Sequence, residues 1–195
     1  MAGGSSRRMG RNKALLRVGS TSLLDRAAGL LSEVCDGVLV SLAAASDFSI
    51  AGQWDVLTDL REDVGPMAGL EAAFSVDPRC AWLLLAVDMP GVDRIVLQAL
   101  LDERVPGKAA TAFWTDGRPQ PLCAVYEPVV VEPLQQVLAA KHYSLSRLLL
   151  QLDARFLETA DPRLVNVNTP DQWQDLGRPD SPGGSVPLAY QIRPG

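Results

Sequence analysis

The sequence has few cysteines, histidines and aromatic residues. Among 195 residues there are three cysteines (Cys35, Cys80 and Cys123) and one histidine, and Phe, Trp and Tyr together make up 6%. A disulfide scaffold needs more cysteine, and the spacing of these three predicts buried reduced thiols. A metal centre built on several histidines is excluded. Any metal must therefore bind to carboxylate, amide or phosphate oxygens.

Long apolar runs and an excess of positive charge are absent too. The longest apolar stretches, such as residues 81–87, fall far short of the roughly 20 residues that cross a bilayer, and the first residues lack a signal peptide's apolar segment. Because 18 Lys and Arg stand against 23 Asp and Glu, the net charge is −5. Such a charge gives no overall attraction to nucleic acid or anionic lipid. We expect a cytoplasmic protein that binds small molecules, with neither nucleic acid nor membrane as a partner.

What is present suits one globular α/β domain. Hydrophobic residues make up 47% and charged residues 21% of the chain, as in ordinary soluble proteins. Helical periodicity marks residues 22–34, 68–75, 95–101, 129–140 and 145–152. Short apolar runs typical of strands mark residues 38–42, 55–59, 81–87, 109–114, 121–126 and 164–167. This alternation predicts a mostly parallel sheet with helices on both faces in residues 1–176, followed by a Pro/Gly-rich tail, 177–195, with a short ordered end at 186–192.

A polar stretch dense in Gly, Ser and Arg occupies residues 2–13. Glycines let backbone N–H groups approach phosphate oxygens closely, and Arg8 and Lys13 have the charge to neutralise a triphosphate. The stretch does not fit the Walker loop, because Lys13 follows Asn12 and precedes Ala14. The alternative interpretation is a disordered basic terminus.

Three further segments carry candidate side chains. Asp88 directly follows the most hydrophobic predicted strand, a position where a carboxylate can hold Mg²⁺ bound to phosphates; the alternative is a capping or turn Asp. The small residues of 65–70 permit close approach by a flat group such as a base, or simply form a tight loop. Asn166 and Asn168 share one face if their segment is a strand, and Asn168 can equally cap the next helix.

Five motifs follow one another in a set order along residues 1–176. They are Ala-Gly-Gly-Ser-Ser-Arg-Arg-Met-Gly, Gly-Pro-Met-Ala-Gly-Leu, Val-Asp-Met-Pro, Gln-Pro-Leu and Asn-Val-Asn-Thr-Pro-Asp. This order resembles the molybdenum cofactor guanylyltransferase family. The resemblance implies a three-layer Rossmann-like nucleotidyltransferase fold and an enzyme that transfers GMP from Mg·GTP to molybdenum-molybdopterin, releasing pyrophosphate. It implies Mg²⁺ as cofactor, GTP and molybdenum-molybdopterin as substrates, and molybdoenzymes or other cofactor-biosynthesis proteins as partners.

The resemblance also implies roles for individual residues. The residues that it sets at the nucleotide and its phosphates are Ala2, Gly3, Gly4, Arg8, Lys13, Ser41 and Asp59. Its catalytic set is Arg8, Lys13 and Asp88, with Asp88 as the Mg²⁺ ligand. Asn166 and Asn168 would face the pterin or the metal-bound phosphates. Because the terminal phosphate of the pterin attacks the α-phosphorus directly, no protein nucleophile is required, and catalysis rests on positioning and electrostatics.

The chain departs from the family pattern in three places. Met1 stands in the Leu position of the family's Leu-Ala-Gly-Gly, so the first strand before it is missing from this sequence. We expect about five to eight apolar residues added before Ala2, a typical strand length, to order the loop and raise stability. Asn12 stands where many relatives have Asp, and Ser41 where Asn is frequent.

The choice of nucleotide and the catalytic competence of the chain are separate questions. The Ala-Gly-Gly and Gly-Pro-Met-Ala-Gly motifs favour GTP over CTP by resemblance. A cytidylyltransferase acting on the same cofactor, or a sugar-phosphate nucleotidyltransferase, would share the glycine-rich loop and Asp88. A non-catalytic nucleotide-binding paralogue is the alternative outside the enzyme class.

Overall fold

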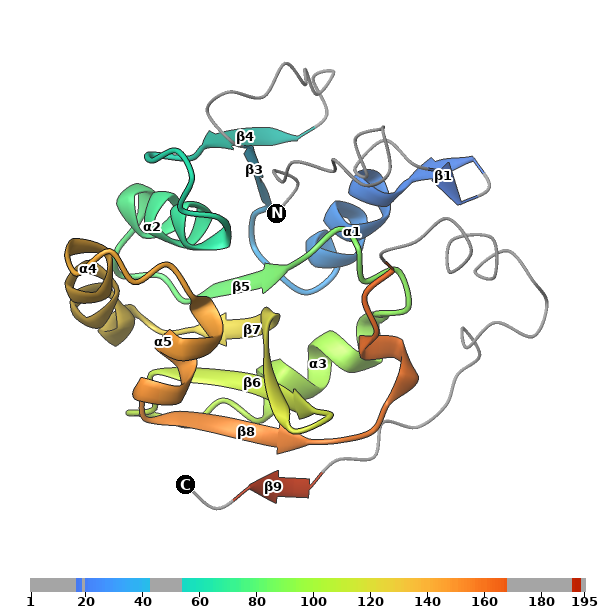
Figure 1. Ribbon diagram of the computed structural model, residues 1–195. Helices are drawn as coiled ribbons and strands as arrows, with labels where there is room; N and C mark the ends of the chain where they lie inside the picture. The colour runs from blue at the N-terminus through green and yellow to red at the C-terminus, as the bar shows by residue number, and fades with distance from the viewer. Residues whose placement is uncertain (1–16, 19, 43–53, 168–190, 194–195) are drawn as a thin grey trace.

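A computed structural model of the protein describes residues 17–18, 20–42, 54–167 and 191–193 (Figure 1). The helices are α1 (Leu23–Ser32), α2 (Pro66–Val76), α3 (Arg94–Asp102), α4 (Val131–Ala139) and α5 (Leu145–Gln151), with short 3₁₀ turns η2 (Pro128–Val130) and η3 (Pro162–Leu164). The strands are β1 (Arg17–Val18), β2 (Thr21–Ser22), β3 (Leu39–Leu42), β4 (Asp55–Thr58), β5 (Trp82–Leu85), β6 (Ala110–Thr115), β7 (Arg118–Tyr126), β8 (Ala154–Glu158) and β9 (Gln191–Arg193). The helices lie where helical periodicity predicts them.

The main sheet has five strands in the order β5-β7-β6-β8-β9, and β3 pairs with β4 in a separate parallel sheet. The expected predominance of parallel pairing is wrong for the described strands, since only β3–β4 and β6–β8 are parallel. The reason is a tight hairpin. Asp116 and Gly117 have φ values of 51° and 76°, the left-handed conformation that two-residue hairpin turns require. This turn reverses the chain and places β7 antiparallel between β5 and β6.

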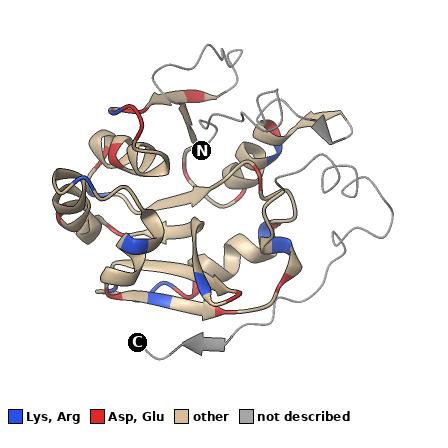
Figure 2. Ribbon diagram, viewed as in Figure 1, with Lys and Arg blue, Asp and Glu red and all other residues tan. Residues whose placement is uncertain are grey.

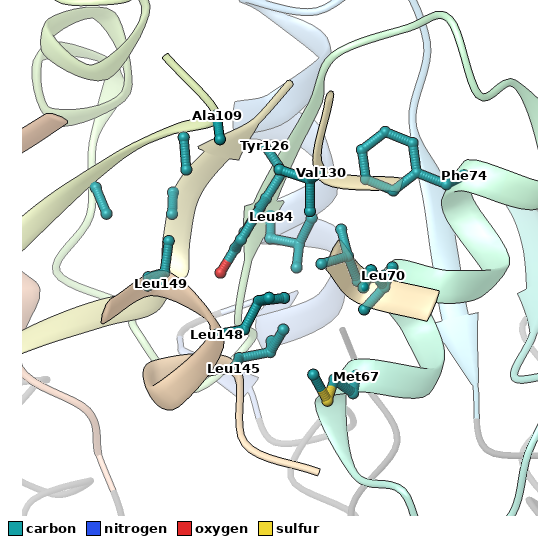
Figure 3. Close-up of a cluster of buried hydrophobic side chains, with 14 of the residues drawn as sticks. Met67, Leu70, Phe74, Leu84, Ala109, Tyr126, Val130, Leu145, Leu148 and Leu149 are labelled. Carbon is teal, nitrogen blue, oxygen red and sulfur yellow. The ribbon is translucent and has the colours of Figure 1, made fainter. Parts of the chain in front are cut away.

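Helices cover both faces of the main sheet, so the α/β class and its three layers are confirmed. Neighbouring residues of each strand alternate between the faces: Leu84 packs with α2, α4 and α5, whereas Leu85 packs with α3. On β7, Tyr126 faces the first group and Val125 the second. Figure 3 shows Tyr126 and Leu84 among the side chains of α2 and α5.

A third apolar cluster joins α1 to the ends of β3 and β5. Its buried members are Leu23, Leu24, Val40, Leu42 and Val87. Ser22 caps α1, as expected, because its hydroxyl accepts a hydrogen bond from the Asp25 N–H at 3.0 Å. The Trp54 indole donates to the Asp25 carboxylate at 3.2 Å, so α1 also contacts the residue that leads into β4.

A cavity of about 450 Å³ lies between β3 and β5. Its lining includes Leu39 and Ser41 of β3, Leu83 and Leu84 of β5, and Gly69 and Ala73 of α2. The two strands belong to different sheets, with β4 at one edge of β3 and β7 at one edge of β5. Figure 2 shows that β5 carries no charged residue, whereas the loop after β4 carries both signs.

Three local expectations need correction. Residues 164–167 are not a strand: Pro162–Leu164 form η3, because proline fixes φ and the Asp161 carboxylate accepts the Arg163 N–H at 2.8 Å. Strand β8 had no counterpart among the predicted strands. The sequence predicts that all three thiols are buried, but only Cys123 is. Cys35 is half-buried, and Cys80, in the turn before β5, is exposed. Strand β9 joins the sheet beside β8, at the end of the tail stretch expected to be ordered.

Candidate functional site

The turn after β5 holds Asp88 at the end of the most apolar strand. Met89, directly after Asp88, is buried, and the Asp88 side chain is half-buried. The Ala86 N–H donates to the Leu122 carbonyl at 2.9 Å, which extends the β5–β7 pairing to the start of the turn. On the other side, Arg26 Nε of α1 donates to the Pro90 carbonyl at 3.0 Å. The sheet and α1 therefore fix both ends of the Asp88 turn.

The segment with Asn166 lies directly against this turn. The Val167 N–H donates to the Asp88 carbonyl at 2.8 Å, so the structure brings together two of the regions that the sequence singles out. Asn166 is half-buried and lies beside the residue that makes this bond. This contact joins the two backbones, although residues 164–167 do not form the strand that the sequence predicts.

A buried arginine anchors the Asn166 segment. Arg163 is 2% exposed, and its Nε and Nη2 donate to the two carboxylate oxygens of Asp161 at 3.0 and 2.7 Å. Its Nη1 donates to Asp93 Oδ2 at 2.7 Å. These bonds lower the pKa of the Asp161 carboxyl and raise the pKa of the guanidinium. A charge buried this deeply requires such partners, because an unpaired one costs several kcal/mol.

Ser41 and Asp59 form a second pair. The Ser41 hydroxyl, which is buried on β3, donates to Asp59 Oδ1 at 2.6 Å, and the Asp59 N–H donates to the Leu42 carbonyl at 2.9 Å. Burial raises the pKa of the Asp59 carboxyl, and the Ser41 hydrogen bond partly offsets this. The structure therefore brings Ser41 and Asp59, two of the residues that the resemblance sets at the nucleotide, into direct contact.

Asp59 and Asp88 both lie near residues of one apolar cluster. Asp59 bonds to Leu42, Asp88 follows Val87, and Leu42 and Val87 belong to the same cluster. In open α/β sheets, the carboxyl ends of strands are where ligands bind. Both carboxylates therefore lie just beyond the carboxyl ends of strands, β4 for Asp59 and β5 for Asp88.

Other sequence candidates have different outcomes. Ala2, Gly3, Gly4, Arg8, Lys13 and Asn168 lie outside the described residues. The Gly-Pro-Met-Ala-Gly-Leu motif begins α2: Gly65 precedes the helix with φ 63°, and Pro66 is its first residue. The side chains of Met67 and Leu70 are fully buried in the core, whereas Gly65, just before the helix, is exposed.

The donor set at the turn suits a hard cation. Asp88 supplies a carboxylate and Asn166 an amide oxygen, the ligand types that Mg²⁺ prefers. Within residues 20–42 and 54–167, no group of three or more His, Cys, Asp or Glu side chains converges on one point.

Comparison with known proteins decides the family. Residues 1–168 match the MobA-like NTP transferase domain. The chain belongs to this family. It is 33% identical over 190 residues to a probable molybdenum cofactor guanylyltransferase of Mycobacterium marinum, an alignment covering 94% of this chain and 92% of the relative. It is thus an enzyme of the nucleotidyltransferase class, and the resemblance noted in the sequence is confirmed.

Solved structures of other proteins share the fold. Molybdopterin-guanine dinucleotide biosynthesis protein A of Archaeoglobus fulgidus superposes with a TM-score of 0.72 at 22% identity, covering 89% of this chain and 92% of the other. A Mycobacterium tuberculosis H37Rv protein in complex with manganese gives a TM-score of 0.60 at 19% identity, covering 85% and 90%. The nucleotidyltransferase fold is therefore confirmed. None of the described helices has the length and apolar character needed to cross a membrane.

Sequence reasoning missed the residues that hold the site together. Asp93 ends the loop before α3, and its carboxylate accepts the Val96 N–H at 3.0 Å, so an Asp before a helical pattern was an available signal. Arg163 stands beside the apolar run 164–167, where a charged residue is unusual. Its pairing with Asp93 joins distant segments, and no local pattern indicates such a contact.

Proposed function

We propose that the chain transfers GMP from Mg·GTP to molybdenum-molybdopterin and releases pyrophosphate. The observation that carries the proposal is the contact between the Asp88 turn and the Asn166 segment, in a chain one-third identical to a probable molybdenum cofactor guanylyltransferase. This contact supports the proposal because it joins the segments that carry Asp88 and Asn166, whose carboxylate and amide suit cation and phosphate binding, after a buried strand.

The reaction makes one P–O bond and breaks another. An oxygen of the pterin's terminal phosphate attacks the α-phosphorus of GTP, and pyrophosphate leaves with the electron pair of the broken bond. Mg²⁺, when bound, neutralises charge on the phosphate oxygens. Asp88 and Asn166 would hold this ion and orient the phosphates around it. Arg8 and Lys13 are proposed to contact the same phosphates.

The nucleoside is proposed to lie on the Ser41–Asp59 side. A carboxylate can accept hydrogen bonds from ribose hydroxyls or from the N–H groups of guanine. The Ser41 hydroxyl uses one oxygen of Asp59, which fixes the orientation of the carboxylate. Because the whole reaction needs positioning and charge stabilisation, it requires no histidine or cysteine nucleophile.

Calorimetric titration with Mg·GTP, Mg·CTP and Mg·ATP tests the choice of nucleotide. We expect GTP to bind most tightly, and equal or tighter binding of CTP would replace the proposal by a cytidylyltransferase.

The variant Asp88→Asn tests the metal ligand. It keeps the side-chain volume and the backbone bond to Val167 but removes the charge, so we expect GMP transfer to be lost while the melting temperature is kept. Asp116→Asn is the matched control, because its residue lies in the β6–β7 turn and asparagine tolerates the positive φ there. Near-native transfer by Asp88→Asn at limiting Mg²⁺ would leave Asp88 as a turn residue only.

A further inference from the structure

The guanidinium of Arg163 connects three pieces of backbone. Asp93, one of its partners, caps the first turn of α3 through the Val96 N–H at 3.0 Å. Asp161, the other partner, caps η3 through the N–H of Arg163 itself at 2.8 Å. The ion pairs therefore join the start of α3, the turn η3 and the segment that continues to Asn166.

The same segment touches the Asp88 turn from two sides. Val167 donates its N–H to the Asp88 carbonyl at 2.8 Å. Gly91 lies against the backbone of Arg163 so closely that a Cβ added to Gly91 would stand 2.9 Å from the Arg163 carbonyl oxygen. Real Cβ atoms do not approach a backbone oxygen to this distance, so the packing at this point requires glycine.

We propose that Arg163 is a positioning residue that sets the separation between the Asp88 carboxylate and the Asn166 amide. The proposal rests on the proposed function, in which both groups act on the same phosphates. Asp93 lies five residues after Asp88, and Arg163 lies three residues before Asn166. The Asp93–Arg163 ion pair and the Val167–Asp88 hydrogen bond therefore join the same two segments at two points, one on each side of Asn166 in the sequence.

The planar guanidinium suits this role because it bonds in several directions at fixed angles. It satisfies both oxygens of Asp161 and one oxygen of Asp93 at the same time. A lysine ammonium keeps the charge but offers no planar fork, so it cannot reproduce all three bonds. Arg163 is buried and its guanidinium is bonded to Asp93 and Asp161, so its effect on the reaction is transmitted through the backbone that it fastens.

Two variants loosen this contact by different means. Arg163→Lys keeps the positive charge and removes the fork. Gly91→Ala leaves the ion pairs in place and pushes the Arg163 backbone away from the turn. Gly29→Ala is the matched control, because a Cβ added at Gly29 meets nothing within 4 Å.

Catalysis and local structure are measured separately, at a temperature where each variant is folded. We expect kcat and kcat/KM for GMP transfer to fall together by about 10–100-fold in both variants, because a small misplacement of reacting groups has this effect. We also expect the Val167 amide to exchange its hydrogen at least about tenfold faster, read by NMR, because its bond to Asp88 opens more often. Gly29→Ala should change neither value.

The outcomes separate this proposal from the proposed function. Folded variants that keep the parent's kcat and its protection of the Val167 amide would overturn the positioning role. If the parent chain itself transfers no GMP, the proposed function fails, and exchange at Val167 still decides whether Arg163 holds the two segments together. If Arg163→Lys does not fold, Gly91→Ala provides the same two readouts.

Discussion

An apolar strand added before Ala2 should stabilise the protein by entering the cavity between β3 and β5. This cavity has a volume of about 450 Å³ and is lined largely by apolar side chains of the two strands, α1 and α2. Among the described strands none lies between β3 and β5, although each pairs with a neighbour at its other edge. An extended segment between them would pair with both edges and join the two sheets.

The expected gain in stability follows from two favourable contributions and one cost. Burying an apolar side chain contributes about 1.5–3 kcal/mol, and ordering one residue costs roughly 1–2 kcal/mol, so these two contributions largely offset each other over a strand. The surplus comes from backbone hydrogen bonds to β3 and β5, at about 0.5–1.5 kcal/mol each. With about three to four such bonds we expect a net gain of about 3 kcal/mol, or about 6–12 °C in the melting temperature of a chain of this size.

Thermal unfolding of three extended chains tests this reasoning. One chain carries about seven Val and Ile residues before Ala2, a typical strand length. The second carries a Gly/Ser/Asn segment of equal length, and the third replaces alternate Val residues by Pro, which cannot donate to a ladder. Only the first should melt higher than the parent and show a larger shift with Mg·GTP. Equal melting temperatures for the first and second chains would show that the cavity does not accept a strand.

Three further predictions concern titratable groups. Arg163 lowers the pKa of the Asp161 carboxyl. The stability that this carboxylate contributes is therefore complete above its unfolded pKa of about 3.9 and is lost as the pH falls below that value. Acid unfolding measured for the parent and for Asp161→Asn tests this, because the variant should lose less stability over that pH range. Ser41→Ala should raise the pKa of Asp59 further, since it removes the hydrogen bond that lowers it; NMR titration of the carboxyl carbon measures this. Burial raises the pKa of Cys123 to about 12, so a thiol reagent should modify Cys80 in the folded protein and reach Cys123 only on unfolding, as mass spectrometry would show.

The sequence predicted what local patterns encode. The N-cap at Ser22 and the periodicity of α1 depend on residues within one segment, and both are confirmed. The strand β8 was missed because Ala154–Glu158 is neither a continuous apolar run nor a clear alternation. Its pairing with β6 makes it a strand, and that partner lies far away in the sequence. The antiparallel pairing of β7 with β5 and β6 was not predicted for the same reason, although the Asp116-Gly117 turn was an available sign of a hairpin.

The site shows the same division between local and distant information. Asp88 could be singled out because its own neighbours, a buried strand before it and a proline after it, define a strand end. Ser41 and Asp59 were each placed near the nucleotide by resemblance, and the hydrogen bond between them became visible only in the structure. Neither its sequence neighbours nor the resemblance pointed to Arg163. Its ion pairs form only when folding brings η3 against the start of α3, because a buried guanidinium needs carboxylate partners and Asp93 and Asp161 come from both segments. A side chain that is costly to bury therefore marks a position where geometry is fixed, and here that position lies in the segment that continues to Asn166 and packs against Gly91 of the Asp88 turn.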